Sequence, residues 1–276
     1  MERLSSVSRF CEALRTRATV AKRDSDFIFC FVNNPGSSAR ASHDEWRVLP
    51  HGAIQELSEN LWRVEGDLPH FSMRRVMTVV RLSDGRLVIH SAIALDEASM
   101  RRLEVWGTPA FLLIPHSRHR LDAPRFKERY PSLRVLVPPA VRKKASEVVH
   151  VDGTYADAPA DPALRLEILD GTGEAEGALI VHSSAGASVI LNEVVFDLDP
   201  PKSSFGRAAL KLVGFGPGAR VTPVVRLELV TDKAALKAHL ERLAATPNLT
   251  RLIVSHVRMS EGAAAAAALR CAAESL

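Results

Sequence analysis

One loop in the chain combines the residue types that metal and anion chemistry use. It follows an apolar run at 111–114, which predicts a buried strand that Pro115 ends. Directly afterwards come two histidines, two arginines and an aspartate: His116, Arg118, His119, Arg120 and Asp122. Imidazole and carboxylate groups are preferred ligands of zinc-type metals. Because ligands of open α/β sheets bind beyond the carboxyl ends of the strands, we expect chemistry at this loop.

The elements that position this loop are predicted from the hydrophobic pattern. Two runs rich in β-branched residues, 75–82 and 86–92, flank Asp84-Gly85 and predict a hairpin. The other elements predicted in the first half are strands at 61–64, 111–114 and 133–137, helices at 96–105, 124–129 and 141–147, and a loop at 153–162. A serine nucleophile at Ser91 would need an adjacent base, but His90 would point to the opposite face of its strand, so we expect none.

The second half of the chain repeats this type of pattern. It predicts strands at 164–169, 178–182, 188–196 and 249–255, a helix from its cap at Thr231 to Ala245, and an Ala-rich helix at 261–275 capped by Ser260. Residues 202–225 predict no clear element. Gly171, Gly173 and Gly177 resemble a dinucleotide-binding loop, but a strand follows them, so we expect a hairpin turn. This order of strands and helices favours a layered α/β sandwich.

Composition limits the classes of protein to consider. The 276 residues are 46% hydrophobic and 25% charged, which is typical of a globular protein. A net charge of +4 and an aromatic content of 5% give no support for a nucleic-acid partner. No apolar run approaches the roughly 18 residues of a membrane helix. Three scattered cysteines favour a reduced, cytoplasmic protein, and the oligomeric state stays unknown.

Residues 1–50 differ from the rest of the chain in their Arg- and Ser-rich composition. Their pattern allows a short helix at 8–17 and a short strand at 27–32, but we expect a poorly ordered extension. They contain no apolar segment that ends in a cleavage site, so we expect no secretory signal. The folded domain is predicted to span residues 51–276.

The order of these elements resembles the metallo-β-lactamase-like superfamily over residues 55–276. The run at 75–91 and the loop from Pro115 to Asp122, followed by Arg125-Phe126 and Tyr130-Pro131, are similar to a divergent bacterial branch of it. The resemblance implies an α/β (α+β) fold, a four-layer αββα sandwich.

The superfamily's metal motif, His-x-His-x-Asp-His, follows the central strand. This chain has His116-x-x-His119-x-x-Asp122 there, which keeps the residue types but changes the spacing. The resemblance implies that His116 and His119 are the nearest equivalents of the metal ligands. Asp122 is the candidate catalytic carboxylate, and its alternative role is to cap the helix predicted at 124–129.

The resemblance also places ligands in the second half. The next family ligand is expected in the turn at 182–188, where its position falls on Ala187 or Ser188, neither a metal ligand of the family's type. Glu193 stands where the family has a bridging aspartate, and His256 matches the histidine that closes the final strand.

The ligand set implied by the resemblance is His116 or His119 with Glu193 and His256. Three ligands would hold one zinc, iron or manganese ion and leave a position for water. A second ion would be short of ligands. Each residue also has an ordinary alternative: a solvated basic loop for the loop histidines, an arginine partner for a buried Glu193, and a simple hydrogen bond for His256. The sequence leaves open whether any metal binds.

Two classes of function follow for a chain with a small-molecule substrate or ligand. The first is a metal-dependent hydrolase of a small ester, thioester, amide or phosphoester. The alternative is a catalytically degenerate, metal-free relative that binds a protein partner, or an anionic ligand through Arg118 and Arg120. A nucleic-acid enzyme is a third class that the composition does not support.

Overall fold

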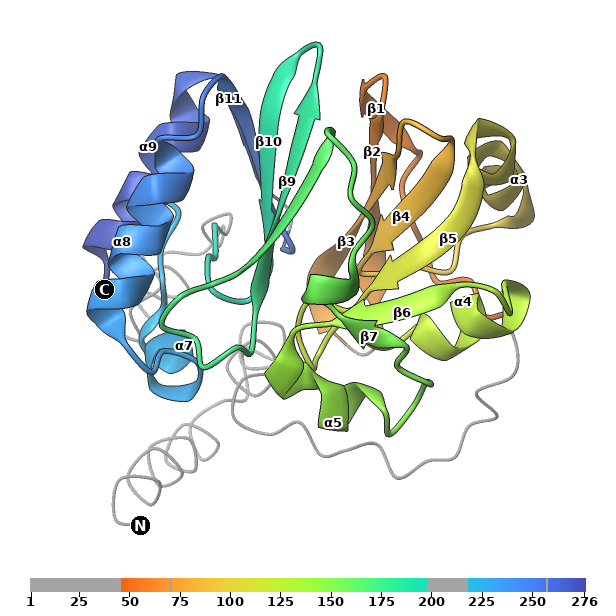
Figure 1. Ribbon diagram of the computed structural model, residues 1–276, viewed down its shortest axis with the longest axis horizontal. Coiled ribbons are helices and arrows are strands. Elements are labelled where there is room, and N and C mark those ends of the chain that lie inside the picture. Colours follow the sequence, from red (N-terminus) through yellow and green to blue (C-terminus); the bar gives the residue numbers. More distant parts are fainter. Residues whose placement is uncertain (1–45, 70, 198–217, 257) are drawn as a thin grey trace, which may run out of the picture.

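Two β-sheets face each other at the centre of the protein (Figure 1). The computed structural model describes residues 46–69, 71–197, 218–256 and 258–276. Within these residues, the first sheet has seven strands in the order β1-β2-β3-β4-β5-β6-β7. They are β1 (Gln55–Ser58), β2 (Leu61–Leu68), β3 (Phe71–Arg81), β4 (Arg86–His90), β5 (Thr108–Leu113), β6 (Arg134–Val137) and β7 (Gly153–Thr154). Pairing is antiparallel from β1 to β4 and parallel from β4 to β7.

The second sheet, counted over the same ranges, has five strands in the order β12-β11-β10-β9-β8. They are β8 (Leu164–Ile168), β9 (Gly177–Ser183), β10 (Gly186–Leu191), β11 (Leu249–Val254) and β12 (Met259–Glu261). Strands β10 and β11 are parallel, so their carboxyl ends lie at the same edge of the sheet. The other pairs are antiparallel.

Helices cover the outer faces of both sheets (Figure 1). The first sheet is covered by α3 (Glu97–Trp106), α4 (Ala123–Arg129) and α5 (Arg142–Ala145), and the second by α7 (Pro223–Glu228), α8 (Lys233–Ala244) and α9 (Ala263–Glu274). Two short 3-10 helices, η1 (Pro139–Val141) and η2 (Tyr155–Asp157), complete the described elements. The result is the four-layer αββα sandwich that the sequence predicts.

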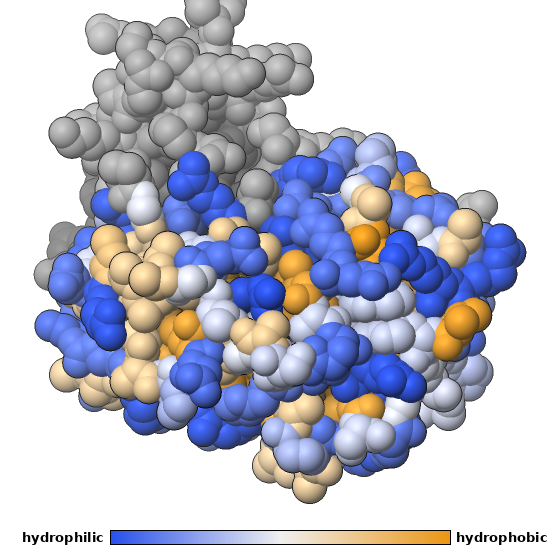
Figure 2. Space-filling model, turned by 90° about the horizontal axis from the view of Figure 1, so that it is seen from above, coloured by the Kyte–Doolittle hydropathy of each residue, from blue (hydrophilic) through white to orange (hydrophobic). Residues whose placement is uncertain are grey.

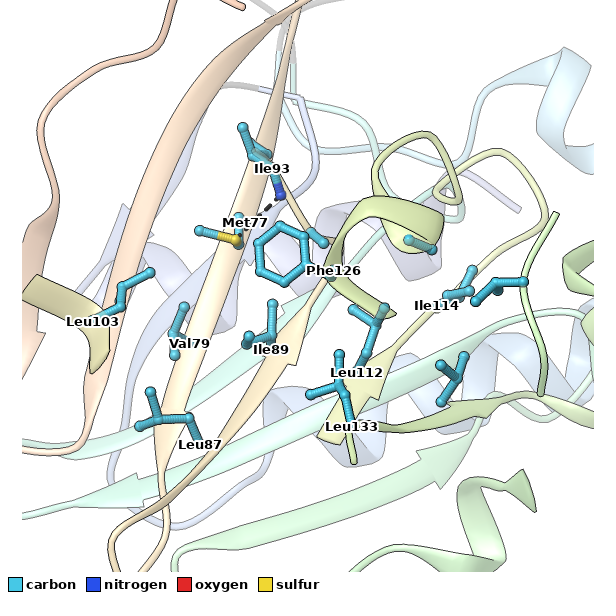
Figure 3. Close-up of a cluster of buried hydrophobic side chains, with 14 of the residues drawn as sticks. Met77, Val79, Leu87, Ile89, Ile93, Leu103, Leu112, Ile114, Phe126 and Leu133 are labelled. Carbon is cyan, nitrogen blue, oxygen red and sulfur yellow. Dashed lines mark hydrogen bonds between the residues drawn. The ribbon is translucent and has the colours of Figure 1, made fainter. Parts of the chain in front are cut away.

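The alternating side-chain direction of strands divides the core into three layers. In β4, Leu87 and Ile89 pack under the helices, whereas Val88 packs between the sheets. Phe126 of α4 lies beside Met77 and Ile89 in the outer layer (Figure 3). On the surface, the face shown in Figure 2 carries small, separate hydrophobic areas surrounded by hydrophilic residues, as is normal for a globular protein.

The two predicted hairpins are confirmed. Strands β3 and β4 pair from Thr78 opposite His90 to Arg81 opposite Leu87, around the Asp-Gly turn. Strands β8 and β9 are also antiparallel, so the glycine-rich segment between them is a hairpin turn and precedes no helix.

The structure corrects four details of the predicted elements. The strand predicted at 188–196 ends at Leu191, and the region expected to be a loop at 153–162 contains β7 and η2. Asp232, not Thr231, caps α8 by accepting a hydrogen bond from the Ala235 N–H. Ser260 is no cap, because it pairs with Leu252 of β11 inside β12.

Folded contacts begin before the predicted boundary at His51. The Trp46 indole N–H donates to the Leu95 carbonyl over 2.8 Å, and its ring centroid lies 5.2 Å from that of Phe126. The helix predicted at 8–17 and the strand predicted at 27–32 lie outside the described residues. Within the part of the chain that the structure describes, every helix is too short or too polar to cross a membrane.

The fully buried position of Phe126 gives a test of the outer core layer. We expect Phe126→Ala to lower the free energy of unfolding by about 3–5 kcal/mol, because the change leaves a cavity under α4. Val105→Ala is the control, because Val105 is 89% exposed on the neighbouring α3 and should change stability by less than about 0.5 kcal/mol. Urea unfolding followed by fluorescence measures both, and equal effects would contradict the packing described.

Candidate metal centre

Three ionisable side chains meet at the carboxyl ends of the strands. His119 comes from the loop between β5 and α4, Glu193 follows β10, and His256 follows β11. Each offers a ligand atom, and these atoms all lie within 4.8 Å of one another. The two sheets therefore bring together residues that are far apart in the sequence, at the edge where ligands of such folds bind.

The Glu193 carboxylate is the centre of the group. Its Oε1 lies 2.9 Å from His119 Nε2 and 3.3 Å from His256 Nε2, and its Oε2 accepts a 3.1 Å hydrogen bond from Arg118. The side chain is only 4% exposed. The arginine partner considered for Glu193 from the sequence is thus present, and metal binding by Glu193 stays a prediction that its position beside two histidines favours.

A second carboxyl group fixes the backbone that carries Glu193. Glu176 is completely buried and accepts hydrogen bonds from the backbone N–H groups of Asn192, Glu193 and Val194. Burial and the nearby Glu193 charge raise the pKa of Glu176 to about 8, against the effect of these hydrogen bonds. The deep carboxyl is therefore the protonated one at neutral pH, and the negative charge belongs to Glu193.

The hydrogen bond of His256 identifies the nitrogen that is free to act as a ligand. Its Nδ1 lies 3.1 Å from the Arg74 carbonyl oxygen, which can only accept, so Nδ1 carries the hydrogen. When the ring is protonated, Nε2–H donates to Glu193 Oε1 over 3.3 Å, and in the neutral ring Nε2 is a lone pair that faces the same oxygen. Two acceptors at this distance need a proton or a cation between them. A metal ion fits this donor set.

The electrostatics favour the deprotonated forms that metals bind. Burial by itself would raise the pKa of Glu193, but hydrogen bonds from His119 and His256 and their charges hold it well below its usual value. Burial lowers the pKa of His119, and the contact with Glu193 opposes part of this effect. At neutral pH the group therefore offers a carboxylate and a neutral imidazole.

His116 lies beside the three-residue group and outside it. Its ring centroid is 6.5 Å from that of His119, and burial lowers its pKa to about 4. His116 lines a pocket of about 150 Å³ next to the candidate ligands. The residues lining this pocket are His116, Ser117, Arg118, Glu193, Val225, Glu228 and Leu229. Of the two loop histidines that the sequence left open, the geometry groups His119 with Glu193 and His256.

The remaining charged residues of the loop are engaged in ion pairs. Arg118 donates to Glu228 over 2.6 Å as well as to Glu193, and Arg120 lies 2.9 Å from Glu147. An anion site at Arg118 and Arg120 stays a prediction, which these carboxylate partners do not favour.

Asp122 is buried beneath the loop and makes three contacts. It lies 2.6 Å from Arg75 and 2.5 Å from Arg125, and it accepts a hydrogen bond from the Ala94 N–H. Asp122 stands at the N-cap position of α4, but the expected side-chain cap is wrong, because its carboxylate accepts no hydrogen bond from a backbone N–H of the first turn of α4. Its catalytic role stays a prediction, and its contacts are those of a residue that anchors the loop to β3 and α4.

The segment at 182–188, where the family resemblance placed another ligand, lies elsewhere. It forms the turn between β9 and β10, and Ser184 there contacts Glu59. Glu193 lies beyond the opposite end of β10, so the length of that strand, about 20 Å, separates the turn from the site.

A layer of buried polar side chains beneath the site is not evident in the sequence. It consists of His90, Asn192 and Ser255. The Asn192 amide lies 3.4 Å from His90 Nε2 and its oxygen accepts a hydrogen bond from Ser255, so the contacts join the two sheets. Asn192 and Ser255 directly precede the candidate ligands Glu193 and His256, and His90 directly precedes Ser91, whose Oγ lies 2.7 Å from His119 Nδ1. A polar residue directly before each of these positions is the only signal in the sequence that could have revealed the layer.

Comparison with solved structures gives the fold a name. A metallo-β-lactamase from Erythrobacter litoralis, with β-mercaptoethanol in its active site, has a TM-score of 0.54 and 13% identity over 81% of this chain and 96% of its own. The mono-zinc form of the metallo-β-lactamase FIM-1 from Pseudomonas aeruginosa has a TM-score of 0.53 and 10% identity over 83% and 98%. The chain has the metallo-β-lactamase fold.

A third structure, the metallo-β-lactamase from Pontibacter korlensis, agrees, with a TM-score of 0.53 and 13% identity over 81% of this chain and 99% of its own. No protein-family model matches the sequence, and no curated protein matches it. The fold resemblance expected from the sequence is thus confirmed. The low sequence identity to these structures is consistent with a divergent branch.

The buried His90 gives a test by pH. Complete burial, with the nearby His119 charge, lowers its pKa from 6.5 to about 3. Between these values the unfolded chain binds a proton there that the folded chain does not, so stability is full above pH 6.5 and falls as the pH is lowered toward 3. His90→Gln keeps an acceptor for Asn192 but removes the group that titrates. We expect it to reduce the slope of the free energy of unfolding against pH by about 1.4 kcal/mol per pH unit. Urea unfolding between pH 4 and 6 measures it, and parallel curves for both proteins would contradict a neutral, buried His90.

Proposed function

We propose that the protein is a metal-dependent hydrolase of a small ester, thioester, amide or phosphoester. In this proposal one zinc, iron or manganese ion is bound by His119, Glu193 and His256. The observation that carries it is that the ligand atoms of His119, Glu193 and His256 all lie within 4.8 Å of one another, with Nδ1 of His256 on a carbonyl and its Nε2 directed at a Glu193 oxygen. The mono-zinc form of the similar FIM-1 structure agrees with a single ion.

A bound metal of this type lowers the pKa of a coordinated water and polarises the substrate. The residues around the pocket suit the rest of the reaction. Arg118 lies in the pocket wall, and its hydrogen bonds to Glu193 and Glu228 hold the carboxylate ligand in position. Val225 and Leu229 form an apolar wall that limits water. The pocket of about 150 Å³ suits a small substrate or the reacting end of a larger one.

His116 has a separate role in this proposal. Its Nδ1 accepts a 3.4 Å hydrogen bond from the Arg118 backbone N–H, so its Nε2 carries the hydrogen of the neutral ring. Because the pKa of His116 is lowered to about 4, the ring stays neutral at pH 7. It is therefore a neutral hydrogen-bond donor for a substrate oxygen beside the ion.

Metal content is the first measurement. We expect about one equivalent of zinc, iron or manganese per chain, lost in His119→Ala and His256→Ala because each removes one of three ligands. His150→Ala is the control, because the side chain of His150 is 77% exposed and lies outside the site. Elemental mass spectrometry on untagged protein measures all four. A wild-type content no higher than that of the ligand variants, even after loading with excess ion, would contradict the proposal.

Glu193 tests whether the same group supports hydrolysis. Glu193→Gln keeps the size of the side chain but removes its charge, so we expect at least about 100-fold lower activity and weaker metal binding. Glu97→Gln is the matched control, because Glu97 pairs with Arg129 on the outer helices. The assay is a panel of ester, thioester, amide and phosphoester substrates with the metal-loaded protein. An activity that survives Glu193→Gln would place the reaction elsewhere.

A further inference from the structure

Ser91 combines an unfavourable backbone conformation with a contact to the site. It directly follows β4 and has a φ of 58°, in the left-handed region that residues with a Cβ rarely adopt. Three non-glycine residues among those the structure describes have a positive φ: Ser91, Glu174 and Asn248. Glu174 and Asn248 are exposed in turns, whereas Ser91 is 3% exposed. A buried outlier of this type persists only where the surrounding structure holds it, and such outliers gather at functional sites.

The Ser91 side chain bonds to one of the candidate ligands. Its Oγ lies 2.7 Å from Nδ1 of His119, while the opposite nitrogen, Nε2, faces Glu193. The Ser91 N–H donates to the carbonyl of Leu113 at the end of β5. Ser91 therefore joins the end of β4 to the strand that leads into the His119 loop.

We propose that Ser91 is a positioning residue that orients the His119 ring and selects Nε2 as its metal-binding atom. The inference rests on the proposed metal function. A hydroxyl can both donate and accept, so the contact suits both states of the ring. Without metal, Nε2–H donates to Glu193 and the hydroxyl donates to Nδ1. When Nε2 is a ligand, the hydrogen is on Nδ1 and the hydroxyl accepts it.

His119 and His256 differ in this respect. The partner of His256 Nδ1 is a carbonyl, which keeps the hydrogen on Nδ1 in the neutral ring. The partner of His119 Nδ1 is a hydroxyl, which allows the hydrogen on either nitrogen. The neutral His119 ring thus moves its hydrogen from Nε2 to Nδ1 when metal replaces the contact with Glu193, and Ser91 holds the ring in place throughout.

Two substitutions separate this role from a purely structural one. Ser91→Ala removes the hydroxyl and keeps the strained φ, whereas Ser91→Gly removes the hydroxyl and relieves the strain. We expect both variants to bind zinc about 10- to 100-fold more weakly than the wild type, in competition with a chromophoric chelator. Their melting temperatures should differ, with the Gly variant above the Ala variant. Asn248→Gly is the control, because it relieves a positive φ in an exposed turn and should keep wild-type zinc affinity.

A wild-type zinc affinity in Ser91→Gly, with a loss only in Ser91→Ala, would show that Ser91 acts through stability and would overturn the inference. A second readout is the nitrogen-15 NMR spectrum of the His119 ring, assigned with His119→Ala. In the metal-free wild type we expect the hydrogen on Nε2, which donates to Glu193, and an Nδ1 resonance shifted by the hydrogen bond it accepts from the Ser91 hydroxyl. In both Ser91 variants we expect the Nδ1 resonance to move toward that of a ring nitrogen without a hydrogen-bond donor, and an unchanged Nδ1 resonance would also overturn the inference. Should the wild type bind no metal, the proposed function fails, while the Nδ1 resonance still tests Ser91.

Discussion

A single buried carboxylate, Glu193, determines how the rest of the site is arranged. A charge in a protein interior is costly unless cations or hydrogen-bond donors surround it. Here two imidazoles approach one oxygen and a guanidinium the other, while Glu176 holds the backbone of the same residue from below. Burial, together with the nearby Glu193 charge, raises the pKa of Glu176 to about 8, which favours its protonated form at pH 7. The charge of Glu193 is therefore paired with Arg118 through Oε2, while Oε1 faces the two imidazoles.

The fold supplies the precision that this arrangement needs. Strands β4, β10 and β11 are central strands, bonded on both sides within their sheets. Their ends are then joined across the sheets by the buried contacts among His90, Asn192 and Ser255. A candidate metal centre divided between two sheets would otherwise change geometry whenever the sheets shifted relative to each other. Ligands on strand ends that are connected in this way are held more rigidly than ligands on free loops.

The sequence predicts much of this structure, for reasons that differ between elements. The hairpin at Asp84-Gly85 and the strands around it follow from local periodicity, which the fold preserves. His256 was recognisable because it directly follows an apolar strand. The choice of His119 over His116, and the contact with Ser91, depend on how β4 and the β5–α4 loop meet in space, which spacing alone does not encode. The turn at 182–188, where the resemblance placed another ligand, has Ala187 or Ser188 at the ligand position, and the structure shows that this turn lies at the end of β10 opposite to Glu193.

The site and the polar layer beneath it use consecutive residues at each strand end. The first residue of each pair, His90, Asn192 or Ser255, makes the buried contacts between the sheets, and the second, Ser91, Glu193 or His256, contacts the site. A deletion or insertion of one residue at any of these strand ends would therefore displace a residue of the site and a residue of the buried layer together. Evolution can vary the loops of this protein in length, but the three strands must keep their residue count for both layers to survive.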